Sequence, residues 1–337
     1  MFFENSTCLR CGSPLGYLPG DRALVALRPE GDVLVPVTGE RGRLRRCTNL
    51  AAARCNWLVP IEDGEPLCAS CRLTTVRPND GDTEAMEAFA DAEGAKRRLL
   101  DQLLGLGLPV IERTTDPERG LAFELLSSRG YDVTTGHQSG VITLDLSESD
   151  DAHREFVRQQ LGEPYRTVLG HLRHEVGHYF WPLLVVDGGR LDRFRELFGD
   201  ERLSYEQAME EHYRGGGPTD WISTHVSQYA TMHPWEDWAE TFAHYLHIRD
   251  GLETATSFGL LVGEPARSVG VDAWRTAEGS SRDGAAVGGM VGDWLGLAVA
   301  LNAMSRSIGQ GDLYPFVLSP LVIDKLDFVH RAVVGTG

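Results

Sequence analysis

Residues 165–181 constrain this chain more than any other stretch, because they combine a helical apolar pattern with a metal-ligand spacing. Within them, His174, Glu175 and His178 follow one another in the order H-E-x-x-H. Residues four apart lie on one helix face, so both imidazoles can reach a single metal ion. Glu175 leaves the same turn at another angle and can act on a water molecule without binding the metal. The stretch therefore predicts an amphipathic helix that carries two ligands of a catalytic zinc site.

A catalytic zinc ion takes three protein ligands and keeps one position open. The third ligand is not six residues after His178, because Leu184 stands there. Residues 229–247 offer Glu236 and Glu240, which are four apart near the start of a predicted helix and share one of its faces. We assign Glu236 as the third zinc ligand and Glu240 as the carboxylate that hydrogen-bonds a ligand imidazole and fixes its tautomer. The reverse assignment of the two acids stays open.

All six cysteines lie in residues 1–75, where short strand-forming runs alternate with Gly, Pro and Asp turns. Two C-x-x-C pairs can close one tetrahedral structural zinc site, and their members are Cys8, Cys11, Cys68 and Cys71. The two remaining cysteines, Cys47 and Cys55, can replace one pair, form a second metal site or be buried thiols, and we favour a buried or auxiliary role. The region is predicted to be a zinc ribbon that folds largely because the metal binds. A redox-active C-x-x-C is the weaker alternative, because no βαβ pattern follows.

The whole chain is predicted to be an α+β protein. Residues 1–75 form the ribbon, residues 76–119 a linker and helical segment, and residues 120–335 a mainly helical domain with a small sheet. Strand patterns in this last part occur in the run LAFELL and in a hairpin around residues 137–140.

The formal net charge is −17 at pH 7, and the acidity lies beyond residue 75, where 23 basic residues face 41 acidic ones. This charge argues against nucleic acid and anionic membrane surfaces as partners. The N-terminus has no basic segment followed by an apolar run. The longest apolar stretch, near residues 294–304, is expected to be too short to span a bilayer. Unpaired cysteines fit a reducing compartment. We therefore expect a cytoplasmic protein with no nucleic-acid or membrane partner.

Three segments resemble zinc-binding metallopeptidases that carry an N-terminal zinc ribbon: HEVGHYFW, YATMHPWEDWAETFAHYLH and LNAMSRSIGQGDLYPFVLSPLVIDKLDFVH. The resemblance covers nearly the whole chain and implies a zincin-like peptidase domain with a peptide or protein substrate. The ligand set is similar to that of the gluzincin peptidases, in which a downstream Glu completes the H-E-x-x-H helix.

The resemblance also implies roles for two further parts of the chain. In the lethal-factor type of gluzincin, a Tyr seven residues before the ligand Glu faces the zinc, and this position is Tyr229 here. The match implies that its phenol donates to the developing oxyanion, with a core or interface tyrosine as the alternative. The fold likeness suggests that residues 141–146 align the substrate backbone by strand addition, with an ordinary sheet strand as the alternative.

Together these observations predict a zinc-dependent peptidase with one catalytic and one structural zinc ion. Glu175 takes a proton from the attacking water and delivers it to the leaving amine. Two other functions stay open. A zinc amide hydrolase that acts on a non-peptide substrate would share every residue, and a non-catalytic zinc-binding interaction module would not need Glu175. The ribbon is expected to contact a protein partner or to place the peptidase domain.

Overall fold

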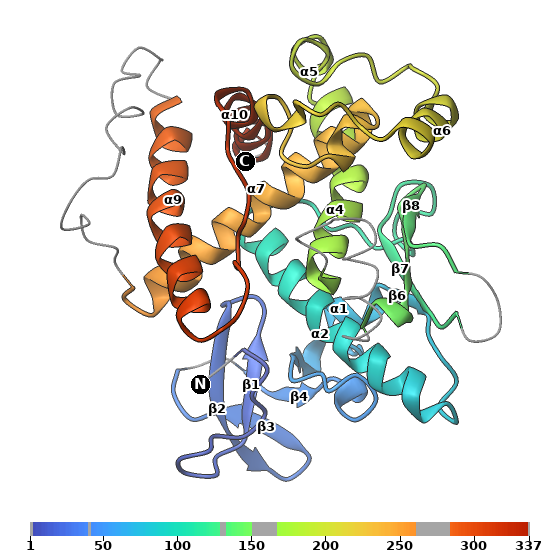
Figure 1. The fold of residues 1–337 in the computed structure, drawn as a ribbon. Coiled ribbons are helices and arrows are strands. Elements are labelled where there is room, and N and C mark those ends of the chain that lie inside the picture. The colour runs from blue at the N-terminus through green and yellow to red at the C-terminus, as the bar shows by residue number, and fades with distance from the viewer. Residues whose placement is uncertain (1–2, 40–41, 129–132, 150–166, 261–283, 336–337) are drawn as a thin grey trace. The chain divides into compact units, whose positions relative to one another are not determined.

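The computed structural model describes residues 3–39, 42–128, 133–149, 167–260 and 284–335 (Figure 1). The chain divides into two compact units. The first comprises Met1–Leu161 with Arg166–Glu175, and the second comprises Gly162–Tyr165 with Val176–Gly337. The division falls inside helix α4 (Val168–Trp181), so this continuous helix contributes to both units. Residues 165 and 166, with which the predicted helix begins, lie outside the described residues.

A five-stranded antiparallel sheet forms the N-terminal part of the first unit. Its strands pair in sequence order: β1 (Leu15–Leu18), β2 (Ala23–Glu30), β3 (Val33–Pro36), β4 (Leu44–Arg46) and β5 (Leu58–Pro60). Val25, Leu27, Leu44 and Leu58 are buried and pack together as a small core. Short 3₁₀ turns follow β4 and β5, at Thr48–Leu50 (η1) and Ile61–Asp63 (η2).

The helix that follows this sheet is fastened to it by polar contacts. After α1 (Ala69–Arg72) and β6 (Thr74–Val76), helix α2 runs over Thr83–Gly105. It begins at Asp82, whose side chain accepts a hydrogen bond from the Ala85 N–H. Tyr17 on β1 donates to Asp101 of α2 at 2.5 Å. The segment expected to be a linker with a helix therefore belongs, through α2, to the same compact unit as the ribbon.

A second sheet has the strand order β6–β7–β9–β8. Strands β7 (Ala122–Leu126) and β9 (Val141–Asp145) pair in parallel along their whole length, and β8 (Gly136–Gln138) pairs antiparallel with the first three residues of β9. The 3₁₀ turn η3 (Leu146–Ser149) follows β9. Residues 141–143 are paired on both sides and offer no free edge for a substrate backbone, whereas strand addition at the rest of 141–146 stays a prediction.

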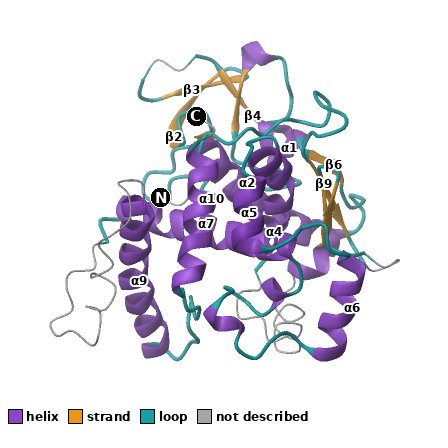
Figure 2. Ribbon diagram, turned by 90° about the horizontal axis from the view of Figure 1, so that it is seen from above, coloured by secondary structure: helices purple, strands orange, loops and turns teal. Residues whose placement is uncertain are grey.

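The second unit is helical and, in its described part, contains no strand (Figure 2). After α4 the chain forms a π-helical turn (η4, Pro182–Val186), followed by α5 (Leu191–Phe198), α6 (Tyr205–Gly215), η5 (Trp221–Ser223), η6 (Tyr229–Thr231), α7 (Pro234–Ser257), α9 (Gly284–Ser307) and α10 (Pro320–Val334). Helix α7 is central and packs against η6, α9 and α10. Aromatic rings fill the space around it, including Phe194, Trp238 and Phe328. These elements confirm the α+β class, with a ribbon followed by a mainly helical domain.

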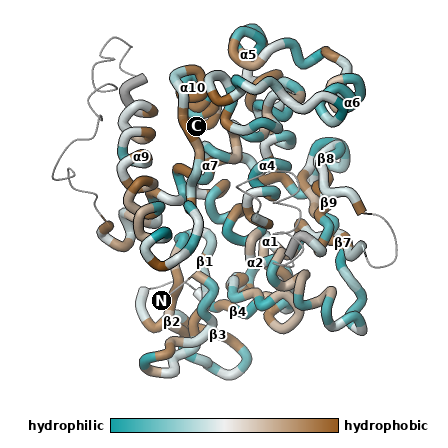
Figure 3. Tube along the Cα trace, viewed as in Figure 1, coloured by the Kyte–Doolittle hydropathy of each residue, from teal (hydrophilic) through white to brown (hydrophobic). Residues whose placement is uncertain are grey.

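Helix α9 is longer than the apolar stretch expected from the sequence. Over Val287–Ser307 it is long and apolar enough to cross a membrane, and 28% of this window is buried. Figure 3 colours most of this helix white to brown. The apolar stretch expected near residues 294–304 was too short because the helix also includes the glycine, alanine and other apolar residues before Asp293. Length and composition are the only grounds for a membrane span, and core helices of soluble proteins meet the same criteria.

Candidate metal centres

Two imidazoles and one carboxylate come together between α4 and the first turn of α7. The ligand atoms of His174, His178 and Glu236 all lie within 4.8 Å of one another. Helix α4 is continuous, so its own geometry sets the separation of the two histidines. His178 Nε2 lies 3.5 Å from Glu236 Oε1, and Glu236 is 2% exposed. Two imidazoles and one carboxylate at this spacing fit the ligands of a catalytic zinc ion, with one position left for water or substrate.

A glycine lets α7 approach α4 this closely. A Cβ atom on Gly177 would lie 3.0 Å from the Ala239 Cα, which is tighter than ordinary packing. The Gly177 carbonyl also accepts a 2.8 Å hydrogen bond from Trp238 Nε1. Because Gly177 directly precedes His178, this contact holds the two helices together at the position of the candidate ligands. A side chain here would separate the imidazole from Glu236.

The carboxylate of Glu236 has a partner that the sequence analysis missed. The Tyr205 hydroxyl, at the start of α6, donates to Glu236 Oε1 at 3.0 Å. No signal in the sequence pointed to this residue, because it lies 31 positions before Glu236 in a helix of its own. Tyr229 lies in the same surroundings. Burial raises its pKa, and the charge of Glu236 and the neighbouring Tyr205 raise it further, so its phenol stays protonated.

The three other predicted site residues, Glu175, Tyr229 and Glu240, lie on α4, η6 and α7. Glu175 lies on α4 beside the first histidine and is 8% exposed. Tyr229 begins η6, directly before α7. Glu240 accepts a 2.7 Å hydrogen bond from the Ser227 hydroxyl, whose oxygen also accepts from the Ala230 N–H. The carboxylate that joins the two imidazoles is thus Glu236, while Glu240 ties α7 to the segment before it. A contact of Glu240 with an imidazole remains a prediction.

Four buried cysteines form the second candidate centre. The sulfur atoms of Cys47, Cys55, Cys68 and Cys71 all lie within 4.8 Å of one another, and none of the four residues is more than 2% exposed. Cys47 directly follows β4 and Cys55 shortly precedes β5, so the pairing of these strands brings them together. The Cys68 N–H points at Cys47 Sγ, at 3.4 Å. Four sulfur ligands with no open position are typical of a structural zinc site.

The predicted grouping of Cys8 and Cys11 with Cys68 and Cys71 is wrong. An antiparallel bridge between Thr7 and Pro14 holds Cys8 and Cys11 in a separate turn. Cys11 is exposed, and its sulfur lies 3.2 Å from the Ser13 hydroxyl. The C-x-x-C spacing shows which cysteines are neighbours in the sequence. It does not show that the sheet places Cys47 and Cys55, rather than Cys8 and Cys11, beside Cys68 and Cys71.

Comparison with known proteins assigns both parts of the chain. Residues 85–332 match the family described as "Putative zinc-binding metallo-peptidase". The chain belongs to this metallopeptidase family. Residues 1–82 match a zinc-ribbon domain. The match to the metallopeptidase family spans all three members of the His/Glu centre, and the ribbon match spans all four buried cysteines. Zinc binding is therefore supported both by the family descriptions and by the cysteine cluster.

Two mycobacterial proteins are similar to this chain over nearly their full length. The chain is 52% identical over 332 residues to the uncharacterized protein Rv2568c of Mycobacterium tuberculosis and to the uncharacterized protein Mb2598c of Mycobacterium bovis. Each alignment covers 98% of this chain and 91% of the relative. No solved structure matches the chain.

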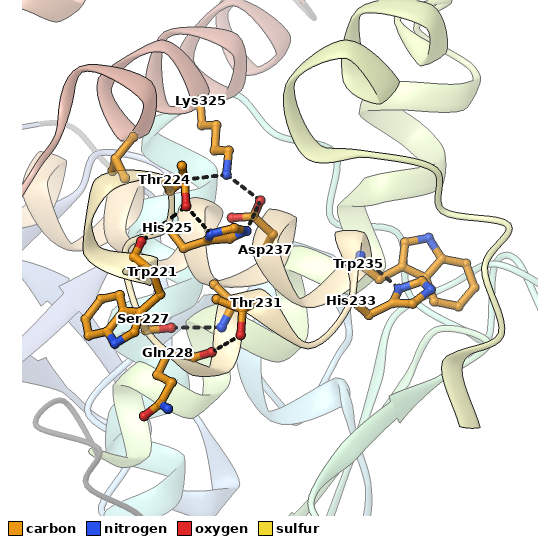
Figure 4. A network of polar contacts seen from close by, with 12 residues as sticks. Trp221, Thr224, His225, Ser227, Gln228, Thr231, His233, Trp235, Asp237 and Lys325 are labelled. Carbon is orange, nitrogen blue, oxygen red and sulfur yellow. Dashed lines mark hydrogen bonds and ion pairs between the residues drawn. The ribbon is translucent and has the colours of Figure 1, made fainter. Parts of the chain in front are cut away.

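A buried ion pair fastens the helix that carries Glu236 (Figure 4). Asp237 lies 2.6 Å from Lys325 Nζ of α10, which also donates to the Thr224 carbonyl at 2.8 Å. Desolvation raises the pKa of Asp237, and the charge of Lys325 opposes this effect. Desolvation and the Lys325 charge lower the pKa of the nearby His225 to about 4, so this imidazole is neutral at pH 7. Lys325 is therefore the cation that compensates Asp237.

Proposed function

We propose that this chain is a gluzincin-type zinc peptidase that hydrolyses peptide bonds. Its zinc ligands are His174, His178 and Glu236, and Glu175 is the general base. The observation that carries the proposal is the convergence of the three ligand groups from two helices within 4.8 Å. The position of Glu175 adds to it, because a purely structural zinc site has no need of a buried carboxylate beside a ligand histidine.

The chain's own residues account for the proton transfers. When bound, zinc supplies a Lewis acid that acidifies water and polarises a carbonyl group. A carboxylate oxygen of Glu175 accepts the proton of the attacking water and returns it to the amide nitrogen of the leaving group. Tyr229 keeps its proton, because burial and the charge of Glu236 raise its pKa, so its hydroxyl can donate to the carbonyl oxygen as negative charge develops. Glu240 orients one ligand imidazole.

A second zinc ion, held by the four buried cysteines, has a structural role. Its site is closed by four sulfur atoms and offers no position for a substrate. We place the protein in the cytoplasm, since none of the six cysteines forms a disulfide and a reducing compartment keeps thiols reduced.

The decisive variant is Glu175→Gln, which keeps the shape of the side chain but removes its basicity. General-base catalysis contributes about 10²–10⁴-fold, so peptide hydrolysis should fall by at least about 10²-fold. Elemental analysis should find the zinc content unchanged. Glu211→Gln, an exposed position on α6, is the matched control and should retain full activity. His178→Ala should lose both one zinc ion and the activity.

A peptide library analysed by mass spectrometry provides the substrate. If Glu175→Gln cleaves the library as fast as the wild type, the assigned base is wrong. If the wild type holds zinc at this centre but cleaves only small non-peptide amides, the protein is an amide hydrolase of another substrate class. If it hydrolyses neither, the interaction-module function is favoured.

A further inference from the structure

Helix α6 lies at the surface, yet its first residue reaches the candidate metal centre. None of the described residues of α6 is fully buried. Tyr205 nevertheless donates through its hydroxyl to Glu236 Oε1 at 3.0 Å. This oxygen also faces the His178 Nε2, at 3.5 Å. The phenol therefore contacts the carboxylate oxygen that lies beside the imidazole.

A second contact fixes the Tyr205 ring against the start of α7. The ring packs edge-on against His233, with centroids 5.4 Å apart. His233 caps α7: its Nδ1 accepts from the Trp235 N–H at 3.1 Å (Figure 4). The ring proton is thus on Nε2, which donates to the Leu203 carbonyl at 3.1 Å. Both the phenol and the chain two residues before it are held at the helix turn that carries Glu236.

We propose that Tyr205 is a positioning residue for Glu236, and that its hydrogen bond holds this carboxylate in the orientation that binds the metal. The inference rests on the proposed function. Glu236 has three rotatable side-chain bonds, and a hydrogen bond to an ionised acceptor is stronger than one between neutral groups. Outer partners of metal ligands orient them in this way, and their loss typically weakens metal affinity or activity about 10–100-fold.

The variant Tyr205→Phe removes the hydroxyl and keeps the ring against His233. Zinc affinity is measured by competition with a chelator of known affinity, on protein whose cysteine centre remains loaded. In His178→Ala only the cysteine centre should hold zinc, so this variant shows how much of the measured zinc belongs to the cysteine centre. The dissociation constant of zinc should rise about 10–100-fold in Tyr205→Phe. Tyr213→Phe makes the same chemical change on the same helix at a side chain that is 68% exposed, and should leave the constant unchanged.

Two further measurements separate positioning from folding. Peptide hydrolysis by Tyr205→Phe should recover when zinc exceeds the raised dissociation constant, because only the occupancy of the site is impaired. The thermal midpoint of the protein lacking zinc at this centre should match the wild type. Equal zinc affinity in Tyr205→Phe and wild type would overturn the inference, as would a weakened affinity accompanied by an equal loss of stability. Absence of a second zinc ion from the wild type would instead overturn the proposed function.

Discussion

Lys325 offers the clearest test of how the helix with Glu236 is held in place. The substitution Lys325→Met keeps the straight apolar stem but removes the ammonium that lies 2.6 Å from Asp237. Asp237 is 1% exposed, and its Oδ1 has no hydrogen-bond partner. The Nε2 atom of the neutral His225 lies 3.6 Å from Asp237 Oδ2. Removing one member of such a buried pair costs about 3–5 kcal/mol. Without Lys325, Asp237 must either stay charged with no partner or take up a proton at a pH above the ordinary pKa of a carboxyl group.

The same helix provides a control. Arg331→Gln breaks an ion pair with Asp327 that has a similar length, 2.7 Å, but whose side chains are 44% and 25% exposed. Exposed pairs four residues apart on a helix contribute only about 0.3–0.5 kcal/mol, because water and salt screen them. The two substitutions therefore differ mainly in burial. We expect their effects on the free energy of unfolding to differ by a factor of about 10.

Urea unfolding at pH 7 with excess zinc, followed by tryptophan fluorescence, measures this difference. Six of the seven tryptophans belong to the second unit, so the signal reports on the unit that contains Lys325. With a urea dependence of about 2 kcal/mol per molar, the midpoint should fall by about 2 M in Lys325→Met. Adding Asp237→Asn should restore much of the loss, since both charges are then absent. If Lys325→Met costs no more than Arg331→Gln, the reasoning is refuted.

Two further predictions concern the metal centres. Cys55→Ser should remove one zinc ion per chain and unfold the five-stranded sheet, whereas Cys11→Ser should keep both zinc ions. Elemental analysis and circular dichroism check this prediction. Loss of a zinc ion in Cys11→Ser would contradict the grouping of the cysteines. Gly177→Val should destabilise the second unit by about 1–3 kcal/mol through overpacking against α7 and should weaken zinc binding beside His178. Urea unfolding and zinc titration test this second prediction, and unchanged values in both would show that α7 can move away at no cost.

Local patterns predicted much of the secondary structure. Pro234 begins α7, as expected of a residue that lacks the N–H and has a fixed φ. The helical segment expected within residues 76–119 is α2, and the short strands expected in residues 1–75 include β2 and β3. The sequence could not show that β8 covers residues 141–143 of β9, since alternation along a strand says which face is buried but not how many neighbours the strand has.

The sequence by itself determined which residues of α4 share a face, because an i, i+4 spacing fixes that within one helix. It likewise indicated a carboxylate at the start of a later helix and cysteine pairs in the first 75 residues. Only the tertiary structure decided that Cys47 and Cys55 join Cys68 and Cys71, and that Tyr205 contacts Glu236. These partners are separated by many residues along the chain, and their approach depends on strand pairing and helix packing, which no local spacing encodes.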